Sequence, residues 1–350
     1  MTAPTTMTGR KRFLATANLQ PTDVTPVWFM RQAGRCLPEY RALREKHPFL
    51  EVARTPELAV EATLMPVDRL GVDGAVLFAD IMLPLDGMGV DFAIKPGVGP
   101  VIDQPIRTMA DVERLRVVDP EEGTPYVLEA LRQLRAALGE RAAALGFAGA
   151  PFTLACYLVD GRPTKEYPLT KAMMYGQPDV WRALMLKLTE VTARYLEGQV
   201  AAGADVVQLF DSWLGLVDAE WYASSVAPYT AMIFDRLRGK VPTIHFSTGT
   251  NHLLAEIAGT NPSMVSIDWR VPLDQAWDVI GPQRGIQGNL DPSRLLAPWA
   301  DVAPAATAIL DRAAGRPGHV FNLGHGLLPA TDPDQLARLV DLVHGYRREQ

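Results

Sequence analysis

Residues 180–210 read VWRALMLKLTEVTARYLEGQVAAGADVVQLF, and the fold class can be inferred from them. Apolar side chains recur at i, i+3 and i+4 spacing from Trp181 to Tyr195, which is typical of an amphipathic helix over 180–202. After a short turn, DVVQLF at 205–210 is a nearly continuous apolar run, of the length expected for a buried strand. A helix that leads directly into a buried strand indicates an α/β protein.

The same alternation extends along the chain on both sides of this stretch. It predicts further strands at 27–30, 75–79, 144–149, 242–246, 264–268, 284–288 and 319–323, and further helices at 55–70, 126–140, 219–239, 251–259, 301–314 and 333–347. Eight strands separated by helices predict a closed (β/α)8 TIM barrel. We expect residues 11–350 to form this single catalytic domain, an extra hairpin around 96–100, and a disordered segment at 1–10.

The amino-acid composition limits the classes of function that the chain could have. The chain has 350 residues, 48% of them hydrophobic, and a net charge of −6, which favours neither nucleic acid nor an anionic membrane as a partner. Residues 142–159 carry no charge, but Gly146, Gly149 and Pro151 interrupt them, so we predict a strand followed by a loop and no membrane span. Cys36 and Cys156 form no CxxC motif, which fits a reducing cytoplasm.

Polar side chains follow the predicted strands at the end where barrel enzymes place their chemistry. Arg31 and Arg35 come directly after the apolar run VWFM. Because a guanidinium grips a carboxylate through two parallel hydrogen bonds, we expect a carboxylate-binding site there. A structural pairing with Glu39 is the alternative, and Arg41 and Arg44 are predicted to be surface residues.

Asp80 ends the apolar run AVLFA and precedes another apolar stretch, so its carboxylate must be hydrogen-bonded, paired or shifted in pKa. A helix-capping or loop-bracing role is the alternative for Asp80. His325 lies between Gly324 and Gly326, which would let the backbone approach a ligand, although a core histidine is also consistent. Tyr157 fits packing and catalysis equally well.

Several common site motifs are missing from the sequence. The six histidines lack zinc-site spacing, Ser212 lies in no nucleophile-elbow motif, and neither a P-loop nor a dinucleotide fingerprint is present.

Seven motifs together resemble the uroporphyrinogen decarboxylase family over nearly the whole chain. They are PVWFMRQAGR at 26–35, FADI at 78–81, GAPFTL at 149–154, KAMMY at 171–175, DWRVPL at 268–273, QGNLDP at 287–292 and NLGHG at 322–326. One departure is Cys36, where this family usually has tyrosine.

The resemblance implies a homodimeric single-domain barrel with no metal and no organic cofactor. Its substrate would be uroporphyrinogen III, whose four acetate side chains lose CO2 to give coproporphyrinogen III in haem biosynthesis. The protonated pyrrole would serve as electron sink, with Asp80, Arg31 and Tyr157 as catalytic residues and the proton donor open between Arg31 and a neighbouring group. By motif position, the residues around the substrate would be Arg31, Gln32, Arg35, Asp80, Tyr157, Ser212 and His325.

Two alternatives stay open at this point. One is a zinc-dependent corrinoid methyltransferase of the same superfamily, although the chain lacks that class's cysteine cluster. The other is a porphyrin-binding barrel without catalytic activity.

Overall fold

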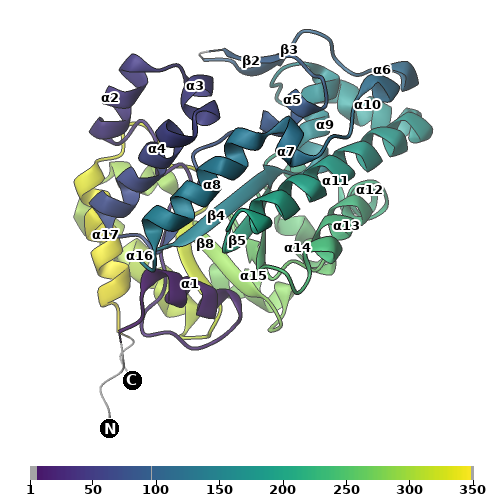
Figure 1. Ribbon diagram of the computed structural model, residues 1–350. Helices are drawn as coiled ribbons and strands as arrows, with labels where there is room; N and C mark the ends of the chain where they lie inside the picture. The colour runs from purple at the N-terminus through teal and green to yellow at the C-terminus, as the bar shows by residue number, and fades with distance from the viewer. Residues whose placement is uncertain (1–5, 96, 348–350) are drawn as a thin grey trace.

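A single curled sheet of seven parallel strands organises the computed structural model, which describes residues 6–95 and 97–347 (Figure 1). The strand order is β1–β4–β5–β6–β7–β8–β9. The bounds are β1 Gly74–Val76, β4 Ala143–Gly149, β5 Val206–Asp211, β6 Thr243–Ser247, β7 Met264–Ser266, β8 Gly285–Leu290 and β9 His319–Leu323. Seven of the eight predicted strands are therefore confirmed, each within a few residues of its predicted bounds.

Helices cover the outside of the sheet. The longer ones are α4 Pro56–Leu70, α8 Pro125–Leu138, α11 Pro178–Ala201, α13 Ala227–Leu237, α16 Trp299–Ala313 and α17 Pro333–Gly345. The shorter ones are α1 Gly9–Ala17, α2 Pro38–Lys46, α3 Phe49–Arg54, α5 Leu83–Gly87, α6 Met109–Arg114, α7 Pro120–Gly123, α9 Pro151–Asp160, α10 Pro168–Gly176, α12 Ala219–Ser225, α14 Leu254–Gly259 and α15 Leu273–Ile280. Proline opens many of these helices, because its fixed φ suits the first turn and its missing N–H is not needed there.

The predicted strand at 27–30 is the one that differs. Val27 forms only an isolated parallel bridge with Phe321 of β9 and is not part of a regular strand. The Phe321 N–H donates to Pro26 O at 2.9 Å, and on the other side the Asp73 N–H donates to Val27 O at 2.8 Å. This segment therefore lies between the two edge strands of the sheet, but the described residues contain no closed eight-stranded barrel.

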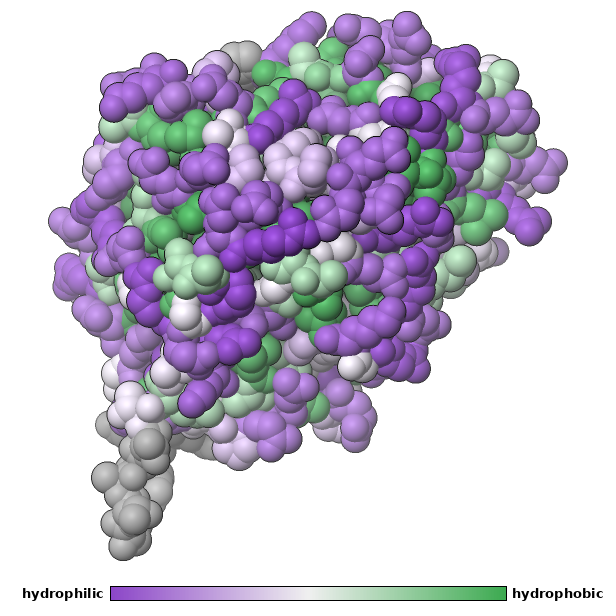
Figure 2. Space-filling view, in the orientation of Figure 1, coloured by the Kyte–Doolittle hydropathy of each residue, from purple (hydrophilic) through white to green (hydrophobic). Residues whose placement is uncertain are grey.

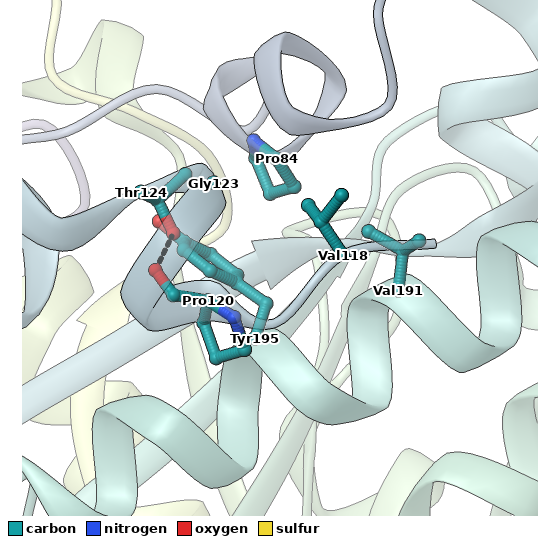
Figure 3. Close-up of a pocket in the computed structure, with 7 residues that line it drawn as sticks. All are labelled: Pro84, Val118, Pro120, Gly123, Thr124, Val191 and Tyr195. Atoms are coloured by element: carbon teal, nitrogen blue, oxygen red, sulfur yellow. Dashed lines mark hydrogen bonds between the residues drawn. The ribbon is translucent and has the colours of Figure 1, made fainter. Parts of the chain in front are cut away.

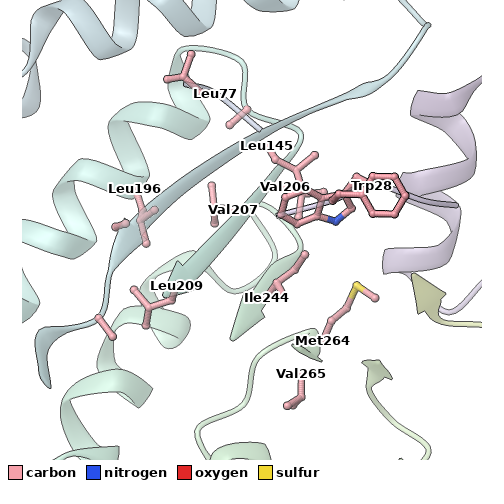
Figure 4. Close-up of a cluster of buried hydrophobic side chains, with 14 of the residues drawn as sticks. Trp28, Leu77, Leu145, Leu196, Val206, Val207, Leu209, Ile244, Met264 and Val265 are labelled. Atoms are coloured by element: carbon pink, nitrogen blue, oxygen red, sulfur yellow. The ribbon is translucent and has the colours of Figure 1, made fainter. Parts of the chain in front are cut away.

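The interior of the sheet contains a polar layer within an apolar core. Gln287 of β8 donates to Gln208 of β5 at 3.0 Å and to Ser266 of β7 at 2.9 Å, and it accepts from the Trp28 indole at 2.9 Å. Since β5 and β8 are not neighbours, Gln208 and Gln287 must both point into the space that the sheet encloses. Figure 4 shows some of the buried apolar side chains, from Trp28, β4 to β7 and α11.

Acidic residues hold helix α1 against the amino ends of the strands. Asp73, directly before β1, accepts from Arg12 at 2.5 Å and from the Val27 N–H at 2.8 Å, and lies 2.8 Å from His344 Nε2 of α17. Asp205, directly before β5, accepts from Arg10 of α1. Helix α1 lies on the opposite side of the molecule from the β2–β3 hairpin (Figure 1).

Four local features refine the predictions. The extra hairpin is confirmed as β2 Phe92–Lys95 paired with β3 Gly99–Ile102. The predicted loop after residue 149 is wrong, because helix α9 begins at Pro151. The helix predicted at 219–239 is two helices that meet at Val226, directly before the Ala227–Pro228 start of α13.

The fourth feature is the amino end. Helix α1 begins at Gly9, and the Met7 N–H donates to Asp23 at 2.9 Å, so the disorder predicted for 1–10 is wrong at residues 6–10. Residues 1–5 of that prediction lie outside the described residues.

The outer surface is largely hydrophilic, with small separate apolar patches on the face that Figure 2 presents. Within the described ranges, every helix is too short or too polar to cross a membrane.

Candidate functional site

Asp80 lies four residues beyond β1, at the carboxyl end of the sheet. Its side chain is half-buried and accepts one hydrogen bond, from the Met82 N–H at 2.9 Å. Loss of water contact raises the pKa of Asp80, while the Met82 N–H and the positive charge of Arg31 oppose this rise. A carboxyl group that is desolvated and only partly compensated is typical of a functional site.

Arg31 lies close enough to both Asp80 and His325 to influence their pKa values. Its φ of 62° is in the left-handed region, and its side chain passes over Gly326, where an added Cβ would lie 2.4 Å from Arg31 Cδ. Gly326 therefore makes room for the Arg31 side chain. An added Cβ at Gly324 would lie 2.5 Å from the backbone nitrogen of Trp269. Both glycines therefore leave room for other groups of the protein, and not for the ligand that the sequence predicted there.

His325 is half-buried beside Phe246, with ring centroids 6.0 Å apart, and its Nδ1 has no hydrogen-bond partner in the described part of the chain. Burial, assisted by the charges of Arg31 and Arg270, lowers the pKa of His325 to about 4. The imidazole is therefore neutral at neutral pH, with an unused buried nitrogen.

Arg35 and Arg44 lie near the same end of the sheet. Arg35 is exposed, and the charges of both arginines act on Tyr40, whose ring packs 5.4 Å from Phe78, two residues before Asp80. Arg44 was expected at the surface, but it is half-buried above the Phe49 ring, and its buried NH1 has no partner among the described residues. A buried guanidinium N–H without an acceptor is costly, which makes Arg44 a site candidate that sequence patterns missed.

Tyr157 and Ser212 come from different elements, Tyr157 from α9 and Ser212 from the turn after β5. Tyr157 of α9 is 8% exposed, and its ring lies 6.2 Å from that of Trp213, the residue after Ser212. Burial raises the pKa of Tyr157, so its hydroxyl stays protonated at neutral pH. The negative charge of Asp80 adds to this rise, which places Tyr157 near Asp80 as well.

Gln32 is turned away from this group. Its side chain is 0% exposed; it accepts from the Phe29 N–H at 3.0 Å and donates to Gly74 O at 2.9 Å. Its amide therefore joins the 27–30 segment to β1, and this position favours a bracing role over the substrate contact predicted by motif position.

Three phenylalanines form an aromatic row that the sequence analysis did not single out. Phe210 shares the inward face of β5 with Gln208, and it pairs in register with Phe246 of β6. The ring centroids are 5.4 Å apart for Phe210–Phe246 and 5.3 Å apart for Phe147–Phe210. The period-two alternation of the strands, counted from the strand ends, could have placed these rings on the inner face.

Figure 3 shows a small pocket between α5, α7 and α11. Its volume is about 10 Å³. That volume admits roughly one water molecule, so this pocket is not a substrate site. Among the residues that the structure describes, no three His, Cys, Asp or Glu side chains gather in a way that could hold a metal ion.

Similarity to known proteins assigns the chain to a family. Residues 8–346 match the family model described as uroporphyrinogen decarboxylase. A uroporphyrinogen decarboxylase of Sorangium cellulosum is 51% identical over 338 residues, which cover 96% of this chain and 97% of that protein. One of Thermobifida fusca is 53% identical over 333 residues, covering 95% and 92% of the two chains.

Among solved structures, a methyltransferase from Methanosarcina mazei superposes with a TM-score of 0.82 over 97% of this chain and 99% of its own. At 20% identity, this likeness concerns the fold alone. The family model and the two sequence relatives span almost the entire chain, and the chain therefore belongs to the uroporphyrinogen decarboxylase family.

Proposed function

We propose that this chain removes CO2 from the four acetate side chains of uroporphyrinogen III and so produces coproporphyrinogen III. The observation that carries the proposal is a desolvated carboxyl group, Asp80, beside Arg31 at the carboxyl end of the sheet. The names of the relatives at about half identity support the same reaction.

The chemistry explains why a lone acidic group is useful here. An acetate cannot expel CO2 unless the electrons of the breaking C–C bond have a place to go. Protonation of a carbon of the attached pyrrole creates a cation that accepts them, and CO2 leaves. The exocyclic carbon then gains a proton to become methyl, and the ring carbon loses the proton that it gained first, which returns the ring to neutrality. A fixed carboxylate near the ring stabilises the cationic stage, and such electrostatic stabilisation is strongest where water is excluded.

Asp80 suits this role because its charge is costly without a partner. Burial raises the pKa of Asp80, so the ionised form is destabilised before the substrate binds. A cationic ring and its N–H groups would supply the compensation that the protein leaves incomplete. The interaction is therefore stronger with the cationic stage than with the empty site, as catalysis requires.

The surrounding groups match the rest of the substrate. Arg31, Arg35 and Arg44 would bind carboxylates at the ring's edge, where guanidinium pairs are strong. The neutral Tyr157 hydroxyl and the neutral His325 imidazole would donate hydrogen bonds to further carboxylates. The row of Phe147, Phe210 and Phe246 would face the apolar parts of the macrocycle.

Three features of assembly and setting complete the proposal. We infer that the 27–30 segment takes the place of the eighth strand, so that the barrel is closed and forms one catalytic domain. Its hydrogen bonds to Phe321 and Asp73 support this. We infer a homodimer, supported by exposed apolar groups on α10, Leu169 and Tyr175, which are 42% and 44% exposed. We infer a cytoplasmic setting, supported by the two free cysteines.

The decisive experiment incubates purified protein with uroporphyrinogen III under anaerobic, reducing conditions. Released CO2 and the carboxyl count of the products are followed together, with the Asp80→Asn variant as control. Stoichiometric CO2 release ending at the tetracarboxylate supports the proposal. Folded wild-type protein that binds the substrate without releasing CO2 would contradict it and favour a binding protein, and zinc-dependent methyl transfer without decarboxylation would favour the other rival.

A further inference from the structure

Tyr157 packs with two other aromatic side chains, Tyr167 and Trp213, in a closed triangle. Tyr157 comes from α9, Tyr167 directly precedes α10, and Trp213 follows β5. The ring centroids are 6.0 Å apart for Tyr157–Tyr167, 6.2 Å for Tyr157–Trp213 and 4.8 Å for Tyr167–Trp213. Tyr167 is 0% exposed, so its only environment is this cluster and the core behind it.

The polar ends of this cluster are left incomplete. The Tyr167 hydroxyl and the Trp213 Nε1 are buried, and neither has a hydrogen-bond partner at normal distance and angle among the described residues. Leaving one buried polar group unpaired costs about 1–3 kcal/mol. Both groups nevertheless lie near enough to the Tyr157 hydroxyl to oppose the rise in its pKa. Their unused hydrogen-bonding capacity therefore faces a residue of the proposed site.

The backbone holds Tyr167 in an unfavourable conformation. Its φ of 46° is left-handed, which is uncommon for a residue with a large side chain. The Tyr167 N–H donates to Thr164 Oγ1 at 2.8 Å, and Thr170 donates through its N–H and hydroxyl to Asp160 at 3.0 and 2.7 Å. Asp160 is the last residue of α9, so these bonds tie Tyr167 to the helix that carries Tyr157.

We propose that Tyr167 is a positioning residue for Tyr157, an inference that rests on the proposed function. An indole N–H can only donate, whereas a phenol can donate and accept. When substrate binds, Trp213 and Tyr167 both donate to the Tyr157 oxygen, and Tyr157 donates to a substrate carboxylate. Each bond in such a chain polarises the next, so the final donor becomes stronger and fixed in direction.

The test compares Tyr167→Phe with a matched control, Tyr222→Phe. Tyr222 of α12 is likewise 0% exposed, with a buried hydroxyl that has no partner among the described residues. We expect Tyr167→Phe to lower kcat/KM for uroporphyrinogen III about 5- to 20-fold, while its melting temperature stays close to that of the control. Tyr222→Phe should leave kcat/KM unchanged.

A double-mutant cycle separates positioning from general packing. If Tyr167 acts through Tyr157, the Tyr157→Phe/Tyr167→Phe protein should be no slower than Tyr157→Phe alone. Independent, multiplicative losses would overturn the inference, as would wild-type kinetics in Tyr167→Phe. Should Tyr167→Phe fail to fold, Trp213→Phe removes the other donor to Tyr157 and must give the same non-additivity with Tyr157→Phe.

Failure of the inference is distinguishable from failure of the proposed function. Wild-type protein without CO2 release would reject the function, whereas an active wild type equalled by Tyr167→Phe would reject only the positioning role. Binding of uroporphyrin, the oxidised octacarboxylate that does not react, is measured in parallel. Its dissociation constant should rise in Tyr167→Phe but not in Tyr222→Phe, and equal constants would overturn the inference even if turnover were absent.

Discussion

The carboxyl group of Asp80 is desolvated, and only one hydrogen bond and one nearby positive charge compensate for the lost water. We predict that Asp80→Asn lowers kcat by at least about 10²-fold, because a neutral amide cannot stabilise a cationic ring. The free energy of unfolding should be equal to or about 1 kcal/mol above that of the wild type, since an unfavourable buried charge is removed. Kinetics and urea unfolding on one preparation measure both effects, and substantial activity would rule out the central role of Asp80.

Arg35 differs from Asp80 because it is exposed. We predict that Arg35→Ala raises KM for uroporphyrinogen about 10- to 100-fold, the loss expected for a charged hydrogen bond, with a smaller change in kcat. Arg35→Lys should recover part of the affinity, since it keeps the charge but not the two-pronged geometry. An unchanged KM in Arg35→Ala would count against carboxylate binding at this position.

At the level of single residues, the position of each residue in the chain indicated most of the candidate site. Arg31, Asp80, Tyr157 and His325 were identified because each follows a predicted strand, and the structure brings Arg31 close to both Asp80 and His325. The order of residues along the chain could not indicate which way a side chain points within a turn. Gln32 neighbours Arg31 in the chain, but its amide is turned toward backbone groups.

Gln32 is the residue that joins two elements, the 27–30 segment and β1. We predict that Gln32→Ala lowers the free energy of unfolding by about 2 to 6 kcal/mol, because it leaves two buried backbone groups unpaired. Gln20→Ala, at an exposed position, provides the control in the same denaturant titration. A stable Gln32→Ala protein with a raised KM would instead support the substrate contact.

Proline explains where the element predictions failed. Pro151 suggested a loop after β4, but at the first position of α9 it favours the start of a helix. Pro228 had the opposite effect, since the periodicity of 219–239 continues through it while the helix is interrupted at Val226. The spacing of apolar residues indicates which side of a segment is buried. It does not reveal an interruption of the helix when the same side stays buried before and after the interruption.

The whole molecule should lose stability in mild acid through the buried His319. Burial lowers the pKa of His319 to about 4, from 6.5, and its Nε2 lies 3.1 Å from Gly288 O. Between pH 6.5 and 4 the unfolded chain binds a proton at His319 that the folded chain does not. Unfolding is therefore favoured as the pH falls, by up to about 1.4 kcal/mol per pH unit.

We predict that His319→Gln has a shallower loss of stability between pH 6.5 and 4 than the wild type. Gln20→Ala, which alters no titratable group, should keep the wild-type slope. Chemical unfolding at several pH values measures the slopes. Parallel curves for His319→Gln and wild type would show that His319 does not carry this proton linkage.

The global architecture was largely predictable from sequence, apart from its closure. Seven strands followed from apolar runs, because strands buried on both faces have few polar residues. The 27–30 segment is equally apolar, but it forms only one bridge, since its neighbour on the other side contributes Asp73 before β1 begins. The pairing of a segment depends on its neighbours in space, which are not visible in its own composition.

The carboxylate of Asp73 has a further consequence for handling the molecule. Gly9 of the first helix lies against it, with an added Cβ only 3.1 Å from Oδ1, and His344 of the last helix lies 2.8 Å from Oδ2. The first and last helices thus meet beside the amino ends of the strands, away from Asp80. A short peptide joining these helices would allow a circular permutant with new termini elsewhere in the chain. A solid support attached at this point would leave the carboxyl ends of the strands, where Asp80 lies, facing the solution.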